Sequence, residues 1–165
     1  ETDGEERWSK RIAQFIVVDR RTKPLETSFD LVKVIQKAIP KKVRMQDKHP
    51  ARRVFQALRI EVNHELDALE QCLTQAADHL APRGRLCVIT FHSLEDRIVK
   101  NAFRTLAKGE AIPAQIPVKA WDVQSPFRLV TRKPIEASPE ELEANPRARS
   151  AKLRVLERRQ ENQEG

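Results

Sequence analysis

The stretch Arg85-Leu86-Cys87-Val88-Ile89-Thr90-Phe91, followed at once by His92 and Ser93, decides the fold class of this sequence. Its nearly continuous apolar character is typical of a strand that is covered on both faces, as in a parallel sheet. Asp96 follows Ser93 by three residues, which is the spacing of a capping box with Asp in place of the usual Glu. The pattern therefore predicts a buried strand, a short loop and a helix over about 94–107.

A long amphipathic pattern precedes this strand and predicts one helix over 51–80. Apolar residues recur on it every three or four positions, at Phe55, Leu58, Val62, Leu66, Leu69, Leu73, Ala76 and Leu80. Gly84 is then placed to adopt a left-handed conformation in a tight turn. Helix, tight turn, strand, loop and helix in this order form one half of a doubly wound α/β unit.

Two further helices are predicted upstream. One covers residues 5–21, and the second begins at a cap provided by Thr27 or Ser28 and ends at Pro40. The basic, polar segment 41–50 then reads as a boundary between a small helical unit and the remainder of the chain.

The chain after residue 108 reads as shorter elements. Residues 109–126 contain three prolines and predict a surface loop. Strands are predicted at 127–131 and 152–156, separated by a short helix that starts at Ser138-Pro139 and by a loop over 145–150.

Composition favours a polyanionic partner without requiring one. The 165 residues hold 31 Lys and Arg against 24 Asp and Glu, a formal net charge of +7. Such a surface attracts phosphate backbones, although a protein with an ordinary charged surface remains an equal alternative. Cys72 and Cys87 lie in apolar patterns and predict buried free thiols, which fits a reducing, cytoplasmic compartment.

Several classes of site have no pattern here. The four glycines are never close together, so no glycine-rich nucleotide loop is present, and no Cys/His spacing suits zinc. We expect no metal and, because no apolar run reaches about 18 residues, no membrane span. The sequence does not begin with Met, which predicts that it starts within a longer protein.

The candidate binding residues fall in two clusters. His92 and Ser93 follow the carboxyl end of the buried strand, where ligands bind in open α/β sheets, and Arg97 and Lys100 lie in the next helix. The alternative is that Ser93 is only a cap and that both cations are solvated. The second cluster, Arg147, Arg149 and Lys152, lies beside a proline and could grip RNA phosphates, or could be an ordinary basic loop.

Four strings in this order resemble the MraW (RsmH) family of bacterial 16S rRNA cytosine-N4 methyltransferases. They are HPARRVFQALRIEVN at 49–63, LAPRGRL at 80–86, TFHSLEDRIVK at 90–100 and NPRARSAKLR at 145–154. The resemblance runs nearly end to end. It implies the C-terminal part of a class I, Rossmann-like, S-adenosylmethionine-dependent methyltransferase of the α/β class, acting on a cytosine of 16S rRNA in the small ribosomal subunit, near the P site.

On this template, residues 1–48 are the end of an inserted helical substrate-recognition domain, and 49–165 are the C-terminal half of the methyltransferase domain. The strand at 86–91 is the fifth of the sheet, and 127–131 and 152–156 are the last two. On the same template, our hypothesis is that this segment supplies a wall of the cleft and RNA contacts through His92, Ser93, Arg97 and Lys100 at the sheet edge and through Arg147 and Arg149 on the loop.

The family's glycine-rich donor loop, its ribose-binding acid and its reacting-centre motif precede these residues. The cofactor S-adenosylmethionine is therefore expected to bind outside this chain, which alone should be inactive. Arg83 also replaces a more usual Gly of the family's turn. Two alternatives remain open: a non-catalytic basic RNA-binding module, and a helical partner-binding protein built around 51–80.

Overall fold

The computed structural model describes residues 8–41, 51–109 and 125–160. The chain divides into two compact units, Glu1–Asn63 (unit 1) and His64–Gly165 (unit 2). No helix within the described ranges is long and apolar enough to cross a membrane. The assignment of residues 1–48 to a substrate-recognition domain stays a prediction.

The described residues of unit 1 include α-helices that pack around a small apolar core. They are α1 (Ser9–Thr22), α2 (Ser28–Ala38) and α4 (Ala51–Asn63). The residues buried at their contacts are Ile12, Leu31, Ile35, Ala38, Ile39 and Ala51. Periodic apolar residues along α1 and α2 therefore predict both helices correctly.

The start of α2 is a complete capping box. Thr27 Oγ1 accepts a hydrogen bond from Asp30 N at 3.2 Å, and Asp30 Oδ2 accepts one from Thr27 N at 3.1 Å. These bonds satisfy backbone donors that the first helical turn leaves without partners. Of the two caps that the sequence allowed, Thr27 is the one used. Lys37 Nζ of α2 lies 2.8 Å from Asp19 Oδ2 of α1 and joins the two helices.

The prediction of one helix over 51–80 is wrong. The segment forms α4 and α5 (Glu65–Asp78), separated by His64 in the left-handed conformation with φ 51° and ψ 39°. The spacing of apolar residues shows that a segment has the helical period, but it does not show that a single residue within the segment has non-helical backbone angles. His is among the residues enriched in this conformation. Ala51 of α4 packs into the core of unit 1, whereas Leu73 and Ala77 of α5 pack into the core of unit 2.

Unit 2 contains a four-stranded antiparallel sheet. Its strands are β1 (Arg85–Thr90), β2 (Phe127–Leu129), β3 (Ile135–Glu136) and β4 (Lys152–Arg158). β4 lies between β1 and β2, and β3 also pairs with β4. Strands predicted at 86–91, 127–131 and 152–156 are thus present, whereas β3 is too short to leave a sequence pattern.

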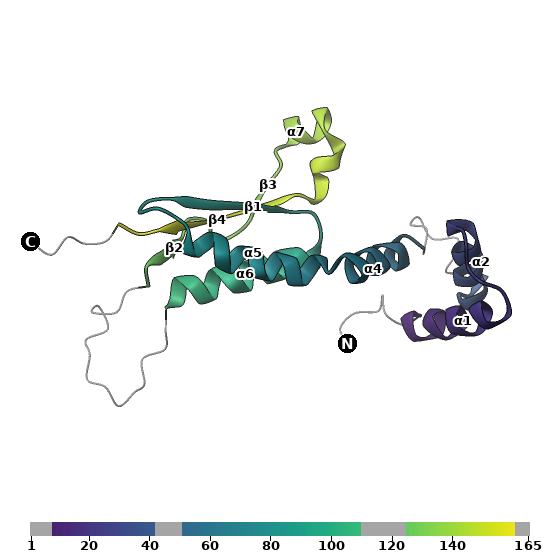
Figure 1. Cartoon of the computed structure of the whole chain (residues 1–165). Coiled ribbons are helices and arrows are strands. Elements are labelled where there is room, and N and C mark those ends of the chain that lie inside the picture. The colour runs from purple at the N-terminus through teal and green to yellow at the C-terminus, as the bar shows by residue number, and fades with distance from the viewer. Residues whose placement is uncertain (1–7, 42–50, 110–124, 161–165) are drawn as a thin grey trace, which may run out of the picture. The chain divides into compact units, whose positions relative to one another are not determined.

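One face of the sheet is covered by α5 and α6 (Ser93–Lys108), which lie side by side (Figure 1). The predicted helix over 94–107 corresponds to α6. The core beneath the two helices consists of Leu73, Ala77, Val99, Phe103, Phe127 and Leu156. It draws on both helices and on two strands, so the core holds unit 2 together.

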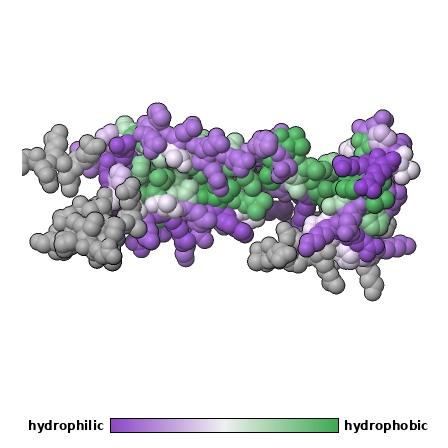
Figure 2. All heavy atoms as spheres, turned by 60° about the horizontal axis from the view of Figure 1, so that its bottom comes forward, coloured by the Kyte–Doolittle hydropathy of each residue, from purple (hydrophilic) through white to green (hydrophobic). Residues whose placement is uncertain are grey.

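The predicted coverage of β1 on both faces is not met within the described residues. Leu86 and Val88 pack toward the helices, while Cys87 and Ile89 alternate onto the other face and are exposed. No described strand pairs with the outer edge of β1. The apolar stretch at 85–91 therefore lies at an edge, with one apolar face uncovered within the described residues. Figure 2 brings the side of α5 and α6 forward and shows a band of hydrophobic residues on unit 2 bordered by hydrophilic ones.

Both cysteines are free, but the prediction that they are buried is wrong. Cys87 lies on the uncovered face of β1, and Cys72 lies on the exposed side of α5 beside the buried Leu73. Apolar residues do surround each cysteine in the sequence, but each cysteine lies on the side of its helix or strand that faces away from the core.

The turn before β1 differs from the prediction in the residue that adopts the left-handed conformation. Arg83 has φ 65°, whereas Gly84 has no positive φ. Gly84 N donates to Ala81 O at 2.7 Å. A Cβ built on Gly84 would lie 2.7 Å from that same oxygen. Gly84 is therefore needed for space, and Arg83 carries the backbone strain.

Replacing Arg83 with glycine is expected to stabilise unit 2 by about 0.5–1 kcal/mol. The left-handed conformation costs an L-residue roughly 1–2 kcal/mol, part of which the greater freedom of unfolded glycine offsets. Gly84→Ala is the matched control and should destabilise, because its Cβ meets the Ala81 oxygen. Urea midpoints measure both changes, and a lower midpoint for Arg83→Gly would contradict the assignment of strain.

The segment between β3 and β4 folds as α7 (Pro139–Ala144) followed by a 3-10 helix, η1 (Pro146–Ser150). Ser138 Oγ accepts a hydrogen bond from Glu141 N at 3.2 Å, which confirms the predicted start of the short helix. The loop predicted over 145–150 is instead this 3-10 turn. Most of the loop predicted over 109–126 lies outside the described residues.

Candidate functional site

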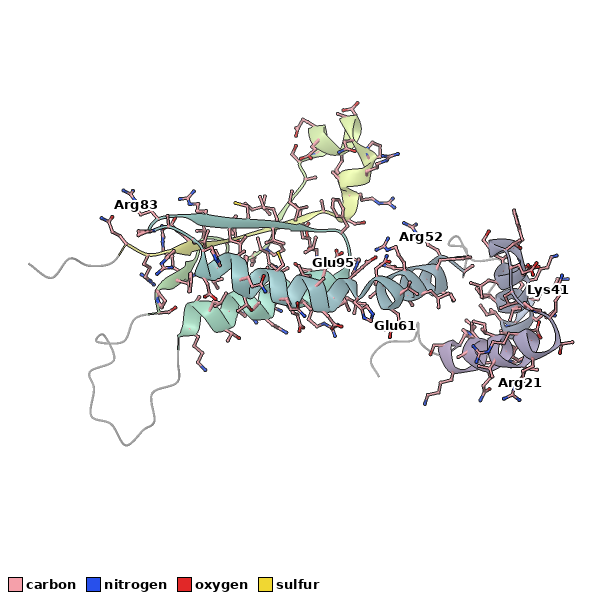
Figure 3. All side chains as sticks on the ribbon, in the orientation of Figure 1. Arg21, Lys41, Arg52, Glu61, Arg83 and Glu95 are labelled. Carbon is pink, nitrogen blue, oxygen red and sulfur yellow. The ribbon has the colours of Figure 1, made fainter. Side chains whose placement is uncertain are left out.

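The candidate site lies where β1 ends and α6 begins. Thr90, the last residue of β1, pairs with Lys152, the first residue of β4, and Thr90 Oγ1 donates to Lys152 O at 3.4 Å. In Figure 3, Glu95 marks this end of the sheet and Arg83 marks the opposite end. One end of the sheet therefore gathers the start of α6 and the start of β4.

His92, rather than Ser93, caps α6, so the predicted Ser93–Asp96 capping box is shifted by one residue. His92 Nδ1 accepts a hydrogen bond from Glu95 N at 3.4 Å, and Glu95 Oε2 accepts bonds from Phe91 N at 2.9 Å and His92 N at 3.3 Å. His92 Nε2 lies 3.0 Å from Glu95 Oε1. The imidazole is thus held at Nδ1 by the first turn of α6, whereas its buried Nε2 forms no hydrogen bond within the described residues.

Because Glu95 takes the place of Asp96 in the capping box, the carboxylate of Asp96 is available and forms an ion pair with Arg154 of β4. Arg154 Nε donates to Asp96 Oδ1 at 2.7 Å, and Arg154 Nη2 donates to Asp96 Oδ2 at 3.1 Å. Lys152 Nζ lies 4.0 Å from Asp96 Oδ2. The hydrogen bonds from Arg154 are the main reason that the pKa of Asp96 lies below its usual value, and burial opposes them. The two hydrogen bonds between Arg154 and Asp96 fix α6 against β4.

Neither Asp96 nor Arg154 is among the candidate binding residues predicted from the sequence, where Asp96 was assigned only to a capping box. The signal was present in β4, where Lys152, Arg154 and Leu156 share one side of the strand and Leu156 is fully buried. A cation in phase with a core leucine requires a carboxylate partner, because an unpaired buried charge is costly. The residues around Arg154 in the sequence do not show which carboxylate pairs with it, because Asp96 lies 58 residues away.

A second carboxylate cluster lies at the opposite end of β1. Glu157 Oε2 accepts from Arg85 Nε at 2.8 Å, and Glu157 Oε1 accepts from Arg128 Nε at 2.7 Å. Hydrogen bonds from Arg128 and Arg85 lower the pKa of Glu157. These contacts join three strands, so their role is structural.

The structure brings only part of the predicted site together. His92 and Ser93 lie at the start of α6, where Ser93 is exposed. Arg97 is exposed one turn later, and Lys100 is half-buried. The remaining two predicted residues are exposed on η1, which leads directly into β4: Arg147 and Arg149. Within the described residues, no hydrogen bond or ion pair joins either of them to α6.

Both carboxylates at the start of α6 are already engaged, whereas the ring of His92 keeps one nitrogen without a hydrogen bond within the described residues. Glu95 is engaged in the cap and Asp96 in the ion pair, so neither carboxylate is free to act as a base. No group of three or more His, Cys, Asp or Glu residues in the described ranges is placed to hold a metal ion. What remains is a rigid edge that presents a hydroxyl and several cations.

The comparisons with known proteins agree on one family. The sequence model of the MraW methylase family matches residues 1–159. A relative from Finegoldia magna, named ribosomal RNA small subunit methyltransferase H, is 58% identical over 156 residues, which is 94% of this chain and 50% of that protein. Proteins of the same name from Clostridioides difficile and Heliobacterium mobile are 55% and 57% identical over 155 residues, again 94% of this chain and 50% of each relative. The chain therefore spans about half the length of these curated relatives, and it belongs to the MraW methylase family.

Proposed function

We propose that this chain is part of an enzyme that transfers a methyl group from S-adenosylmethionine to N4 of a cytosine in 16S rRNA. The observation that carries the proposal is identity above one half along 94% of the chain to relatives named as small-subunit rRNA methyltransferases. The proposed location is the cytoplasm, where rRNA is found and where two free thiols remain reduced.

The physical task divides between this chain and residues outside it. A cytosine amine is a weak nucleophile because its lone pair is delocalised into the ring, so alignment with the sulfonium methyl group must supply much of the acceleration. The target base must also be unstacked or single-stranded before it can enter a pocket. No glycine-rich donor loop occurs in these 165 residues. We therefore assign donor binding to the remainder of the enzyme, and one wall of the cleft to this chain.

The wall is the end of the sheet described above. We propose that His92 and Ser93 line it, that Arg97 and Lys100 contact RNA beside it, and that Arg147 and Arg149 contact RNA from η1. The Asp96–Arg154 pair supports this wall as a positioning element, because it joins the first turn of α6 to the start of β4.

The uncovered side of β1 also supports the proposal that the rest of the enzyme lies outside this chain. Ile89 and Phe91 are 59% and 56% exposed, and the outer edge of β1 has no described partner. Open edges and apolar faces of this kind favour association with further structure. We propose that the other half of the enzyme adds strands to this edge. This arrangement is not expected of a free-standing RNA-binding module.

Methyl transfer from radiolabelled S-adenosylmethionine to unmodified small ribosomal subunits tests the proposal. The samples are these 165 residues alone, the remaining half of the Finegoldia magna relative alone, and the two joined in one chain. We expect incorporation at cytosine N4 only with the joined protein, together with donor binding by calorimetry. Donor binding by the 165 residues alone would show that the donor site is misplaced, and a folded joined protein that transfers nothing would contradict the function.

A further inference from the structure

A row of cations runs along the outward face of α6. Arg97, Lys100, Arg104 and Lys108 follow one another at steps of three, four and four residues, which places them on one side of a helix. Val99 and Phe103, on the other side, are fully buried in the core of unit 2. The row spans eleven residue steps, or about 16 Å of helix axis.

The two carboxylates of α6, Glu95 and Asp96, both lie in its first turn, and residues 97–108 contain no Asp or Glu. Asp96 is held by Arg154 and is also attracted to Lys100. Within the described residues, Arg97, Arg104 and Lys108 form no ion pair or hydrogen bond. Like charges three or four residues apart repel each other on a helix. A solvated helix face ordinarily mixes the two signs, so this row keeps a repulsion that a bound polyanion would relieve.

The neighbouring helix has the opposite charge. α5 carries Glu65, Asp67, Glu70 and Asp78, and it contains neither Lys nor Arg. Because α5 and α6 pack side by side on the same face of the sheet, the covered side of unit 2 is divided into an acidic half and a basic half. An approaching polyanion would therefore be directed to α6 and away from α5.

The connection between β2 and β3 adds one more cation to the row. Lys100 and Arg104 line a small hollow together with Arg132 and Thr131. Thr131 Oγ1 accepts a hydrogen bond from Val155 N at 2.9 Å, which leaves its hydroxyl proton available to a further acceptor. Two guanidinium groups, an ammonium and a hydroxyl are the donors that commonly bind a phosphate group.

We propose that Arg97, Lys100, Arg104 and Lys108 of α6, with Arg132, form a track for the RNA phosphate backbone that continues away from the cleft. The proposal rests on the proposed function and adds Arg104, Lys108 and Arg132 to the RNA-binding surface. The exposed residues between the cations, Asn101 and Thr105, are polar, so this face lacks the apolar side that an interfacial membrane helix requires. A phosphate backbone fits the row better than a lipid surface does.

The test measures the salt dependence of RNA binding by the 165-residue chain, using fluorescein-labelled oligocytidylate and oligoadenylate. The variant Arg104→Gln/Lys108→Gln/Arg132→Gln removes three positive charges from the track. The control Gln71→Glu/Thr74→Glu/Gln75→Glu lowers the net charge equally, on exposed positions of α5. Circular dichroism confirms that both variants are folded. We expect the track variant to bind both RNAs about tenfold more weakly and with a salt slope smaller by about two, and the control to bind nearly as the parent does.

Equal losses in the two variants, or an unchanged slope in the track variant, would overturn the proposal. Binding to phosphatidylserine vesicles but not to RNA would overturn it as well. The joined protein is assayed for methyl transfer in parallel, and the track variant should need a higher RNA concentration than the parent to reach half of its maximal rate. If the parent joined protein transfers no methyl group while the slope difference persists, the proposed function fails and the track stands.

Discussion

Replacing Phe103 with alanine is expected to lower the free energy of unfolding of unit 2 by about 4 kcal/mol, through lost burial and the cavity that remains. Phe103 is 1% exposed and lies in the cluster that joins α5, α6, β2 and β4. No other aromatic side chain reaches this position from α6, so neighbouring residues can fill the cavity only by moving.

Hydrogen exchange resolves the effect by unit. The amides of Val155 and Leu156 in β4 should exchange much faster in the Phe103→Ala variant, whereas those of Val34 and Ile35 in α2 should keep their protection, because they belong to unit 1. The control Thr105→Ala changes an exposed position of the same helix and should alter neither set. An equal loss of protection in α2 would show that the two units unfold together.

Replacing Asp96 with asparagine is expected to cost about 3 kcal/mol, because it leaves the Arg154 guanidinium without its charged partner in a site where only 9% of that side chain is exposed. The double variant Asp96→Asn/Arg154→Met should recover much of this loss, since it removes both charges together. The control Asp67→Asn changes a carboxylate that is 75% exposed and should be nearly neutral. Urea denaturation of the parent, the two single variants Asp96→Asn and Arg154→Met, and the double variant gives the coupling energy. Additive single effects would contradict a specific pair.

The same pair predicts acid sensitivity. The pKa of Asp96 is lowered in the folded protein by hydrogen bonds from Arg154, and that of Glu157 by hydrogen bonds from Arg128 and Arg85. A lowered folded-state pKa stabilises the protein fully above the unfolded value of about 4, and this stabilisation is lost as the pH falls through the folded-state value. The parent should therefore lose stability from about pH 5 downward. The Asp96→Asn variant should show a shallower loss, and parallel curves would contradict the assignment.

Local patterns predicted most of the elements in this chain. The capped start of α2 at Thr27 or Ser28, the strand at β1, the helix at α6 and the Ser138-Pro139 start of α7 each depend on residues within a few positions of one another. The break at His64 escaped prediction because a single left-handed residue leaves the hydrophobic period on both sides intact. The exposure of Cys87 escaped it because an apolar run does not reveal which face of a sheet is covered.

The candidate site was predicted only in part for a similar reason. His92, Ser93, Arg97 and Lys100 were selected from their position after a strand, and their contact with RNA stays a prediction. The Asp96–Arg154 pair joins residues 58 positions apart, and only the antiparallel placement of β4 beside β1 brings them together. Arg104 and Arg132 were overlooked because their shared hollow depends on how the β2–β3 connection lies against α6. Local sequence patterns do not show which distant segments come into contact in the fold.

The open edge of β1 is the feature on which the account depends. Val155 N donates to Thr131 Oγ1, and Val155 O accepts from Val130 N, so the peptide groups of Val155 face away from β1. Hydrogen bonds alternate along an antiparallel ladder. The amides of Arg85, Cys87 and Ile89 therefore point to the open edge, while those of Leu86, Val88 and Thr90 bond to β4.

Amide hydrogen exchange along β1 tests this claim most directly. In the 165-residue chain, the Cys87 and Ile89 amides should exchange rapidly and those of Leu86 and Val88 slowly. In the protein joined to the other half of the Finegoldia magna relative, all four should be protected, because a new strand pairs with the edge. Slow exchange of Cys87 and Ile89 in the 165-residue chain, or unchanged fast exchange in a folded joined protein, would contradict the account.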